Sequence, residues 1–280
     1  LPENTPFNWV ELVSRNLTTQ MLATLFDFPW EERHKLSMWS DAAVSDERIT
    51  GKADLTLEER QLMAVDIFES FSKLWQERLD DGVESFDLIR LMQKDPNTKD
   101  LINDPVMFIG NLMLLIVGGN DTTRNSMTGG VIFFNENPGE LEKVRNDTSL
   151  IPSMVSEVIR FQTPLPHMRR TVTRDFEFKG QHMKKGDKVV LWYCSANRDD
   201  DVIKNPDSFV IDRESPRNHA SFGFGIHRCM GNRLAEMQLR VLWEECLDLF
   251  EAIEVQAEPM RLSNNFVRGY SELEVVVKRQ

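Results

Sequence analysis

The sequence predicts a mainly α-helical protein with small β-sheets, of the α+β class. Over most of the first 160 positions, apolar residues recur at three- and four-residue steps, which is the pattern of amphipathic helices. Two later regions, about residues 170–194 and 254–278, contain short β-branched segments separated by turn residues, which predicts strands. A chain of 280 residues can bury a substantial core and could form one large domain or two small ones.

The helices follow from their start and stop signals. Thr56 and Glu59 form a capping box at the start of one long helix, and Asp104-Pro105 opens the longest. Helices are predicted at 6–26, 30–43, 56–79, 85–93, 105–137, 138–145 and 152–162, and a last one ends at 249. The longest spans about 50 Å at 1.5 Å per residue. The polar stretch 45–54 is predicted to be a loop, and strands are predicted at 170–173, 176–178 and 188–194.

Composition excludes several classes of protein. The net charge of −12, with acidic residues spread widely, argues against nucleic-acid binding, which requires a basic face. Three cysteines in a long chain indicate a reducing compartment, here the cytoplasm, and no disulfide framework. Cys194 and Cys246 lie in apolar segments and are predicted to be core residues. The apolar stretch 106–119 is too short to span a bilayer of roughly 30 Å, so no transmembrane segment is predicted.

The middle of the longest predicted helix carries Gly118-Gly119-Asn120-Asp121-Thr122-Thr123. Two adjacent glycines cost roughly 1 kcal/mol each relative to alanine, so helix formation alone disfavours them. One hypothesis is that the small side chains let a flat ligand approach, while Asp121 and Thr122 loosen the helix and present polar groups. The alternative is a helix crossing, which also favours glycine but does not require an acid followed by two threonines.

A glycine-rich loop delivers Cys229 to the start of the last predicted helix. Gly223, Gly225 and Gly231 indicate backbone that takes positive φ or passes close to another group. The unpaired N–H groups at a helix start favour negative charge, and His227, Arg228 and Arg233 add positive potential. We therefore expect the thiol to ionise easily and to act as a nucleophile or a metal ligand.

A single cysteine in such a loop has several possible functions. A free cysteine is often only a buried structural residue. A phosphatase-like nucleophile would need an arginine six residues later, where Ala235 stands, and a protease-like nucleophile would need a better placed base than His227. The remaining interpretation is a lone axial thiolate on a haem iron, with aromatic and glycine residues against the porphyrin.

Three motifs resemble those of the cytochrome P-450 family. Phe222, Gly225, Cys229 and Gly231 fit its haem-binding signature F-x-x-G-x-x-x-C-x-G, and His227 stands where the family has Arg or His. Residues 118–123 fit its [AG]-G-x-[DE]-T-[TS] motif, and Glu157-x-x-Arg160 fits its E-x-x-R motif. As a lone pattern E-x-x-R is weak, but the three motifs occur in the family's order.

This resemblance implies a P-450 fold that lacks its amino-terminal helices and strands, so that residues 1–280 form a single partial domain, a carboxy-terminal fragment. It implies haem b ligated by the Cys229 thiolate, with O₂ as co-substrate. Thr122 would support the proton network of the bound oxygen, and Asp121 would relay protons to it. Arg213 would complete a buried network with Glu157 and Arg160. The resemblance also assigns a haem propionate to Arg170.

The amino-acid sequences of residues 118–130, 167–171 and 221–236 resemble those of the bacterial soluble subfamily that hydroxylates the terminal carbon of medium-chain alkanes and fatty acids. The resemblance implies a hydrophobic small-molecule substrate, with Gly118, Leu165 and Phe266 nominated for its pocket. The helices at 30–43 and 56–79 would form a lid over this pocket, with plain core packing as the alternative.

The expected partners are an iron-sulfur ferredoxin and its NAD(P)H-dependent reductase. Between residues 212 and 240 five arginines outnumber three acids, which could steer an acidic carrier, although some of these arginines could instead bind propionates or structural carboxylates. Two other hypotheses stay open. The chain could be a catalytically incomplete haem-binding fragment, or a peroxide-driven hydroxylase, which would not need the Asp121-Thr122 pair.

Overall fold

A computed structural model describes residues 1–44, 55–80, 82–83 and 86–280. The loop predicted at 45–54 lies outside the described residues, as does the predicted helix start at Ser85. The helices are η1 (Val10–Arg15), α1 (Asn16–Phe26), η2 (Trp30–Glu32), α2 (His34–Val44), α4 (Leu57–Asp80), α5 (Leu88–Lys94), η3 (Leu101–Asn103), α6 (Pro105–Glu136), α7 (Pro138–Asn146), η4 (Thr148–Leu150), α8 (Ile151–Gln162), α9 (Tyr193–Ala196), η5 (Gly225–His227) and α10 (Asn232–Leu249).

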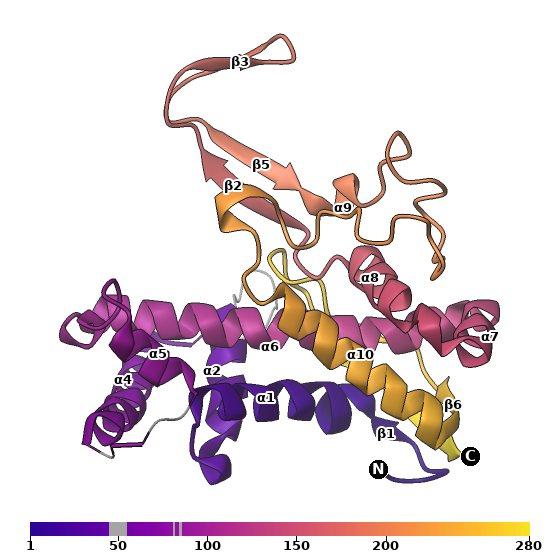
Figure 1. Ribbon diagram of the computed structural model, residues 1–280, viewed down its shortest axis with the longest axis horizontal. Coiled ribbons are helices and arrows are strands. Elements are labelled where there is room, and N and C mark those ends of the chain that lie inside the picture. Colours follow the sequence, from indigo (N-terminus) through magenta and orange to yellow (C-terminus); the bar gives the residue numbers. More distant parts are fainter. Residues whose placement is uncertain (45–54, 81, 84–85) are drawn as a thin grey trace.

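Helix α6 is the central element of the fold, and it runs across the middle of Figure 1. Helices α1, α2, α8 and α10 all pack against it. Its first half belongs to one apolar core with α1, α2, α4 and α5, through Phe108, Leu112 and Ile116. Its second half belongs to another core with α8, α10 and the terminal strands, which includes Met127 and Val131. The Gly118–Asp121 turn therefore lies between the two cores.

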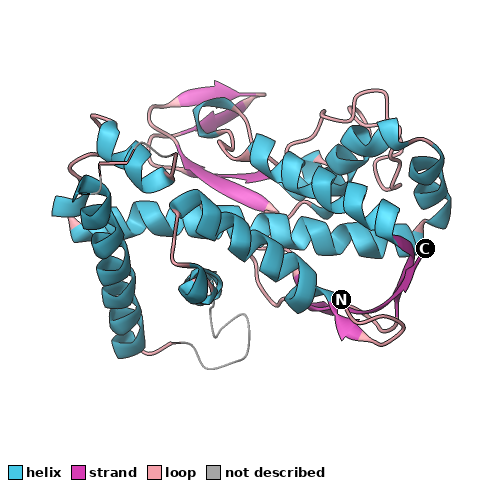
Figure 2. Cartoon of the chain, turned by 60° about the horizontal axis from the view of Figure 1, so that its bottom comes forward, coloured by secondary structure: helices cyan, strands magenta, loops and turns pink. Residues whose placement is uncertain are grey.

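The strands form small antiparallel sheets, as the α+β prediction requires. They are β1 (Phe7–Asn8), β2 (His167–Thr171), β3 (Phe176–Phe178), β4 (Gln181–Met183), β5 (Lys188–Trp192), β6 (Phe250–Val255), β7 (Met260–Arg261), β8 (Tyr270–Glu272) and β9 (Glu274–Arg279). The described strands pair as β1-β9-β6, β2-β5, β3-β4 and β7-β8. Strands β2, β5 and β3 extend away from α6 in Figure 1, whereas Figure 2 shows both termini at one end of the molecule.

Several predicted boundaries are confirmed. The Thr56 N–H donates to Glu59 Oε2 at 2.7 Å and the Glu59 N–H donates to Thr56 Oγ1 at 3.2 Å, which is the capping box. At the start of α6, Asp104 accepts from the Met107 N–H at 3.1 Å. Cys246 lies in the core, as predicted, and burial raises its pKa to about 12.

Other boundaries were wrong. The first helix does not begin at Pro6, because Phe7 and Asn8 pair with β9, and α-helix starts only at Asn16. The strand predicted at 170–173 is β2, displaced towards the amino end, because its register with β5 begins at His167. The residues after Trp192 form the short helix α9, so Cys194 is half-buried instead of lying in the core.

Among the described residues, α6 is the one helix whose length and composition would let it cross a membrane. The same helix packs against four others within the fold. Since core helices of soluble proteins also have this length and composition, the finding is weak evidence for a membrane span.

Candidate functional site

The loop around Cys229 has the tight backbone that its glycines predicted. Gly223 and Gly225 adopt φ values of +65° and +77°, and a Cβ on Gly223 would lie 2.9 Å from the Tyr193 hydroxyl. Gly231 differs, because its φ is −87° and a Cβ there would meet no heavy atom of the described residues within 4 Å. The Cys229 N–H donates to the Phe222 carbonyl at 2.9 Å, which closes the loop just before α10.

The expectation of an easily ionised thiol was wrong for the protein alone. Although Cys229 is an exposed residue, partial burial of its thiol raises the pKa above its usual range. The Gly231 N–H and the Arg228 charge act in the opposite direction but are outweighed. Since a cysteine must lose its proton to ligate a metal, ionisation here would accompany metal binding.

His219 packs against Phe222, the aromatic residue of the Cys229 loop. The ring of His219 lies 5.5 Å from that of Phe222, and its Nδ1 accepts the Ser221 N–H at 3.3 Å. Burial, with the positive charges of Arg160 and Arg228, lowers the pKa of His219 to about 4. His219 is therefore neutral at physiological pH and braces the loop as a packed ring.

The two glycines in the middle of α6 serve different purposes. A Cβ on Gly119 would lie 2.9 Å from Leu22 Cδ2, so Gly119 permits the crossing with α1. A Cβ on Gly118 would meet no heavy atom of the described residues within 4 Å, the backbone of its own helix aside, and Gly118 is exposed. The half-buried Thr122 donates its hydroxyl to the Gly118 carbonyl at 3.0 Å. Helix α6 is continuous through this turn, so the hypothesis that Asp121 and Thr122 loosen it stays a prediction.

Asp121 faces α2 and is nearly inaccessible to solvent. Its carboxylate accepts the Ser40 hydroxyl at 2.9 Å and forms a close ion pair with Arg124. Arg124 also meets Asp41 at 3.0 Å, and Asp41 meets Arg15 at 2.8 Å. Burial raises the pKa of Asp121, whereas the charge of Arg124 opposes that rise. Asp121 is thus linked to α2 directly through Ser40 and indirectly through Arg124 and Asp41.

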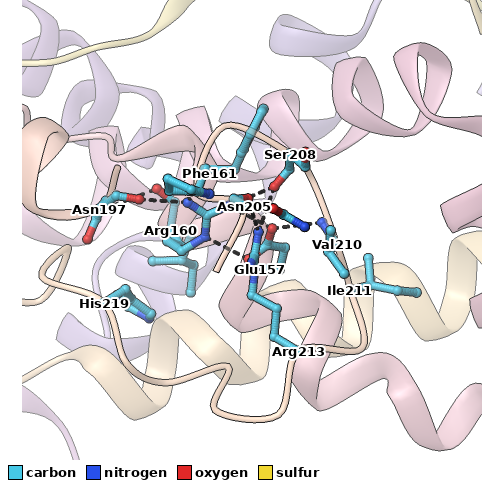
Figure 3. A network of polar contacts seen from close by, with 12 residues as sticks. Glu157, Arg160, Phe161, Asn197, Asn205, Ser208, Val210, Ile211, Arg213 and His219 are labelled. Carbon is cyan, nitrogen blue, oxygen red and sulfur yellow. Dashed lines mark hydrogen bonds and ion pairs between the residues drawn. The ribbon is translucent and has the colours of Figure 1, made fainter. Parts of the chain in front are cut away.

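The three residues predicted to form a structural network do meet (Figure 3). Arg160 binds Glu157 through Nε at 2.7 Å and through Nη2 at 2.8 Å. Arg213 donates its Nε to the same carboxylate at 2.9 Å. The remaining guanidinium N–H groups donate to backbone carbonyls of Asn197, Lys204, Asn205, Pro206 and Ser208. The network therefore holds residues 197–213 against α8. These residues come shortly before the Cys229 loop in the sequence.

The other predicted site residues stand on separate elements. Arg170 is half-buried on β2 and Leu165 is half-buried after α8. Phe266 is exposed in the loop between β7 and β8, and His227 is exposed in η5. None of these four is joined to another by a hydrogen bond or ion pair in the described part of the chain.

The arginine-rich segment is more neutral than its composition indicated. Arg213 binds Glu157, Arg217 and Arg233 share Glu236 at 2.9 and 3.3 Å, and Arg240 lies 3.5 Å from Glu244. Arg228 instead lies over the Phe222 ring. Because two arginines share one acid, a net positive charge remains beside the cysteine loop.

Sequence reasoning missed Arg124, Ser40 and Asp41. The spacing Asp121-x-x-Arg124 is the same i, i+3 pattern that identified Glu157 and Arg160, so this pair could have been predicted. The α2 partners carry no such local signal. In the described ranges no group of three or more His, Cys, Asp or Glu could hold a metal ion, so a metal at this site would depend on Cys229.

Comparisons with known proteins place this arrangement. A model of the cytochrome P450 family matches residues 57–277. Linalool 8-monooxygenase of Pseudomonas putida is 42% identical over 61% of this chain and 42% of its own length. Methyl-branched lipid omega-hydroxylase of Mycobacterium tuberculosis is 31% identical over 97% of this chain and 63% of its own length.

Among solved structures, cytochrome P450-153 from Novosphingobium aromaticivorans superposes with a TM-score of 0.87 at 44% identity, over 99% of this chain and 67% of that one. The chain thus spans between 42% and 67% of the length of these three relatives. The family match covers most of the chain, and the mainly helical fold with small sheets agrees with it. This protein belongs to the cytochrome P450 family.

Proposed function

We propose that this chain carries the thiolate side of a haem-dependent monooxygenase that hydroxylates an unactivated C–H bond of a hydrophobic substrate. The observation that carries the proposal is the Cys229 loop, in which one thiol stands on a tight glycine backbone before α10. When bound, haem b supplies the iron and the redox chemistry by which one atom of O₂ enters the substrate.

The residues present fit such a cofactor. The Cys229 sulfur accepts a backbone N–H from Gly231, which favours the thiolate once a metal replaces the proton. Phe222, Gly225, His227 and Gly231 are the loop positions that would line the porphyrin. Arg170, on β2, is the cation proposed for a propionate.

On α6, Thr122 and Asp121 would supply protons for the reaction. The Thr122 hydroxyl donates to the Gly118 carbonyl at 3.0 Å, beside the exposed Gly118. Asp121 can pass a proton only if its bonds to Arg124 and Ser40 rearrange. We therefore propose that movement of α2 controls this step.

The substrate is proposed to be a medium-chain alkane or fatty acid that is oxidised at its terminal carbon. The 31% identical relative is named as an omega-hydroxylase of methyl-branched lipids, and the structural relative at 44% identity is of type P450-153. Gly118, Leu165 and Phe266 are the proposed pocket residues.

The electron donor is proposed to be an iron-sulfur ferredoxin with its NAD(P)H-dependent reductase, acting in the cytoplasm.

Replacement of the cysteine tests the proposal. In Cys229→Ser we expect loss of the thiolate-type absorption of the reduced carbon monoxide complex and loss of hydroxylated product. Cys194→Ser is the matched control, because that half-buried cysteine lies in α9, outside the loop. If Cys229→Ser kept the thiolate-type absorption, the assignment would be refuted.

The share of the relatives that this chain covers favours a second candidate, a haem-binding but catalytically incomplete fragment. Haem titration and hydroxylation assays on the 280 residues, beside the full-length protein, separate the two. Haem binding without turnover by the 280 residues would favour the fragment.

A further inference from the structure

Two asparagines on α6 have the same bonding pattern ten residues apart. Asn125 Nδ2 donates to the Asp121 carbonyl at 2.7 Å, and its Oδ1 accepts the Tyr270 N–H at 2.9 Å. Asn135 Nδ2 donates to the Val131 carbonyl at 2.9 Å, and its Oδ1 accepts the Val255 N–H at 3.0 Å. Each amide therefore links one turn of α6 to a strand from the carboxyl end of the chain.

The two asparagines differ in what they connect. Asn135 lies at the exposed end of α6 and holds an edge of the β6 sheet. Asn125 is completely buried and bonds the backbone carbonyl of Asp121, within the turn that carries Thr122. Its other partner belongs to the β7–β8 hairpin, residues 260–272, which carries Phe266 and is the yellow segment above the middle of α6 in Figure 1.

The contact between Asn125 and the hairpin is close. A Cβ on Gly269 would overlap the amide of Asn125, so only glycine allows the hairpin backbone to approach this far. Gln162, at the end of α8, holds the hairpin from another side, because its Nε2 donates to the Arg268 carbonyl at 2.8 Å. The Arg268 N–H donates to the Pro164 carbonyl at 2.8 Å, next to Leu165.

The tip of the hairpin reaches α2. Asn264 Nδ2 donates to the Val44 carbonyl at 2.7 Å, and its Oδ1 accepts the N–H groups of Phe266 and Val267 at 2.7 and 2.9 Å. Three side-chain amides thus tie the hairpin to α6, α8 and α2. Of these ties, the one made by Asn125 is the link to the Asp121–Thr122 turn.

We propose that Asn125 is a positioning residue, which fixes the distance between the Asp121–Thr122 turn and the hairpin that carries Phe266, and so determines which carbon of the substrate is oxidised. The inference rests on the proposed function. Both hydrogen bonds of the Asn125 amide are to backbone groups, one in α6 and one in the hairpin. Asn125 therefore acts through the relative position of these two segments. The depth to which a chain-like substrate enters the pocket depends on the space between the residues that contact its leading end and the site where it is oxidised.

The test compares Asn125→Ala with Asn135→Ala in the haem-loaded protein. Asn125→Ala removes the acceptor of the Tyr270 amide, so we expect hydrogen exchange at Tyr270 to rise about tenfold. Asn135→Ala should leave Tyr270 unchanged while raising exchange at Val255. This readout needs no turnover.

The second readout is the product distribution with fatty acids of increasing chain length. Asn125→Ala should shift oxidation from the favoured carbon to its neighbours by several-fold, whereas Asn135→Ala should keep the wild-type distribution. Gly269→Ala leaves the amide of Asn125 in place but pushes the hairpin away, so it should cause the same shift.

The outcomes separate the inference from the proposed function. Unchanged regiochemistry in both Asn125→Ala and Gly269→Ala, with normal thiolate-type absorption, would overturn the inference. A wild-type protein that forms no hydroxylated product would overturn the proposed function instead, and exchange at Tyr270 would still decide whether Asn125 holds the hairpin.

Discussion

Two buried clusters of acid and arginine stand on two helices of this protein, and they are built differently. The Glu157 cluster joins α8 to residues 197–213, and its two guanidinium groups also donate to backbone carbonyls. The Asp121 cluster joins α6 to α2 through side chains alone. In the described structure Arg124 Nε is buried without a hydrogen-bond partner, whereas no such atom occurs on Glu157, Arg160 or Arg213 themselves. Beside the two clusters, Asn120 Nδ2 and Arg198 Nη1 are also buried without a partner in the described structure.

We propose that this difference separates a structural network from one that takes part in the proposed function. A buried charge is tolerated when its hydrogen bonds are complete, as around Glu157. An incompletely bonded charge costs stability, and such sites are expected where function requires a charge to change partners. We infer that the Glu157 cluster holds the loop in place, while the Asp121 cluster is free to rearrange with α2.

The largest expected effect is that of Glu157→Gln. The change leaves Arg160 and Arg213 buried without a carboxylate, which should lower the free energy of unfolding by about 3–5 kcal/mol. Chemical denaturation at pH 7 measures this. The control is Glu244→Gln, which removes an exposed ion pair with Arg240 and should cost less than about 1 kcal/mol. Equal costs in the two variants would mean that the Glu157 cluster is not structural.

A smaller effect is expected from His219, which lies beside the Glu157 cluster. Burial lowers its pKa from the ordinary value of 6.5 to about 4 in the folded chain, so below pH 6.5 the unfolded chain binds the proton more readily. The contribution of neutral His219 is present above pH 6.5 and is lost as the pH falls towards 4, by up to about 3 kcal/mol.

His219→Gln keeps an acceptor for the Ser221 N–H and removes this titration. Denaturation curves at pH 7, 6, 5 and 4 should therefore show a smaller loss of stability in the variant than in the wild type. His182→Gln, at an exposed position on β4, is the control and should keep the wild-type slope. A wild-type slope in His219→Gln would show that burial does not exclude a proton from the ring.

The fold was predictable where one signal lies in a few neighbouring residues. Capping by Thr56 and Asp104 and the E-x-x-R pair depend on residues three apart, and the structure confirms them. The start of the chain was not predictable in this way, because Phe7 and Asn8 take their conformation from β9 more than 260 residues later. Pairing with a distant strand overrides the local Thr-Pro signal.

The candidate site shows the same limit. The loop glycines and the i−4 bond of Thr122 follow from local backbone geometry. The ionisation of Cys229 was mispredicted because it depends on how far the folded loop buries the sulfur, which charge counting does not reveal. The contact of Asp121 with Ser40 joins positions 81 residues apart, so no spacing rule could supply it.

The smallest expected effect is that of Asp121→Asn, and its pH dependence distinguishes the two clusters most sharply. Because burial raises the folded pKa of Asp121 above 3.8, its contribution to stability is largest below that pH and is lost as the pH rises. Asparagine has no such titration, so the variant should gain stability relative to the wild type as the pH rises. At pH 7 it should cost less than Glu157→Gln, because Arg124 keeps its ion pair with Asp41.

Denaturation of both proteins from pH 4 to 8 measures this difference, and hydroxylation rates of the same samples should fall in the variant because its side chain cannot carry a proton. A variant that instead loses stability relative to the wild type as the pH rises would show that attraction to Arg124 outweighs the cost of burial. Asp121 would then resemble Glu157, and α2 would be anchored to α6 in the way that residues 197–213 are anchored to α8.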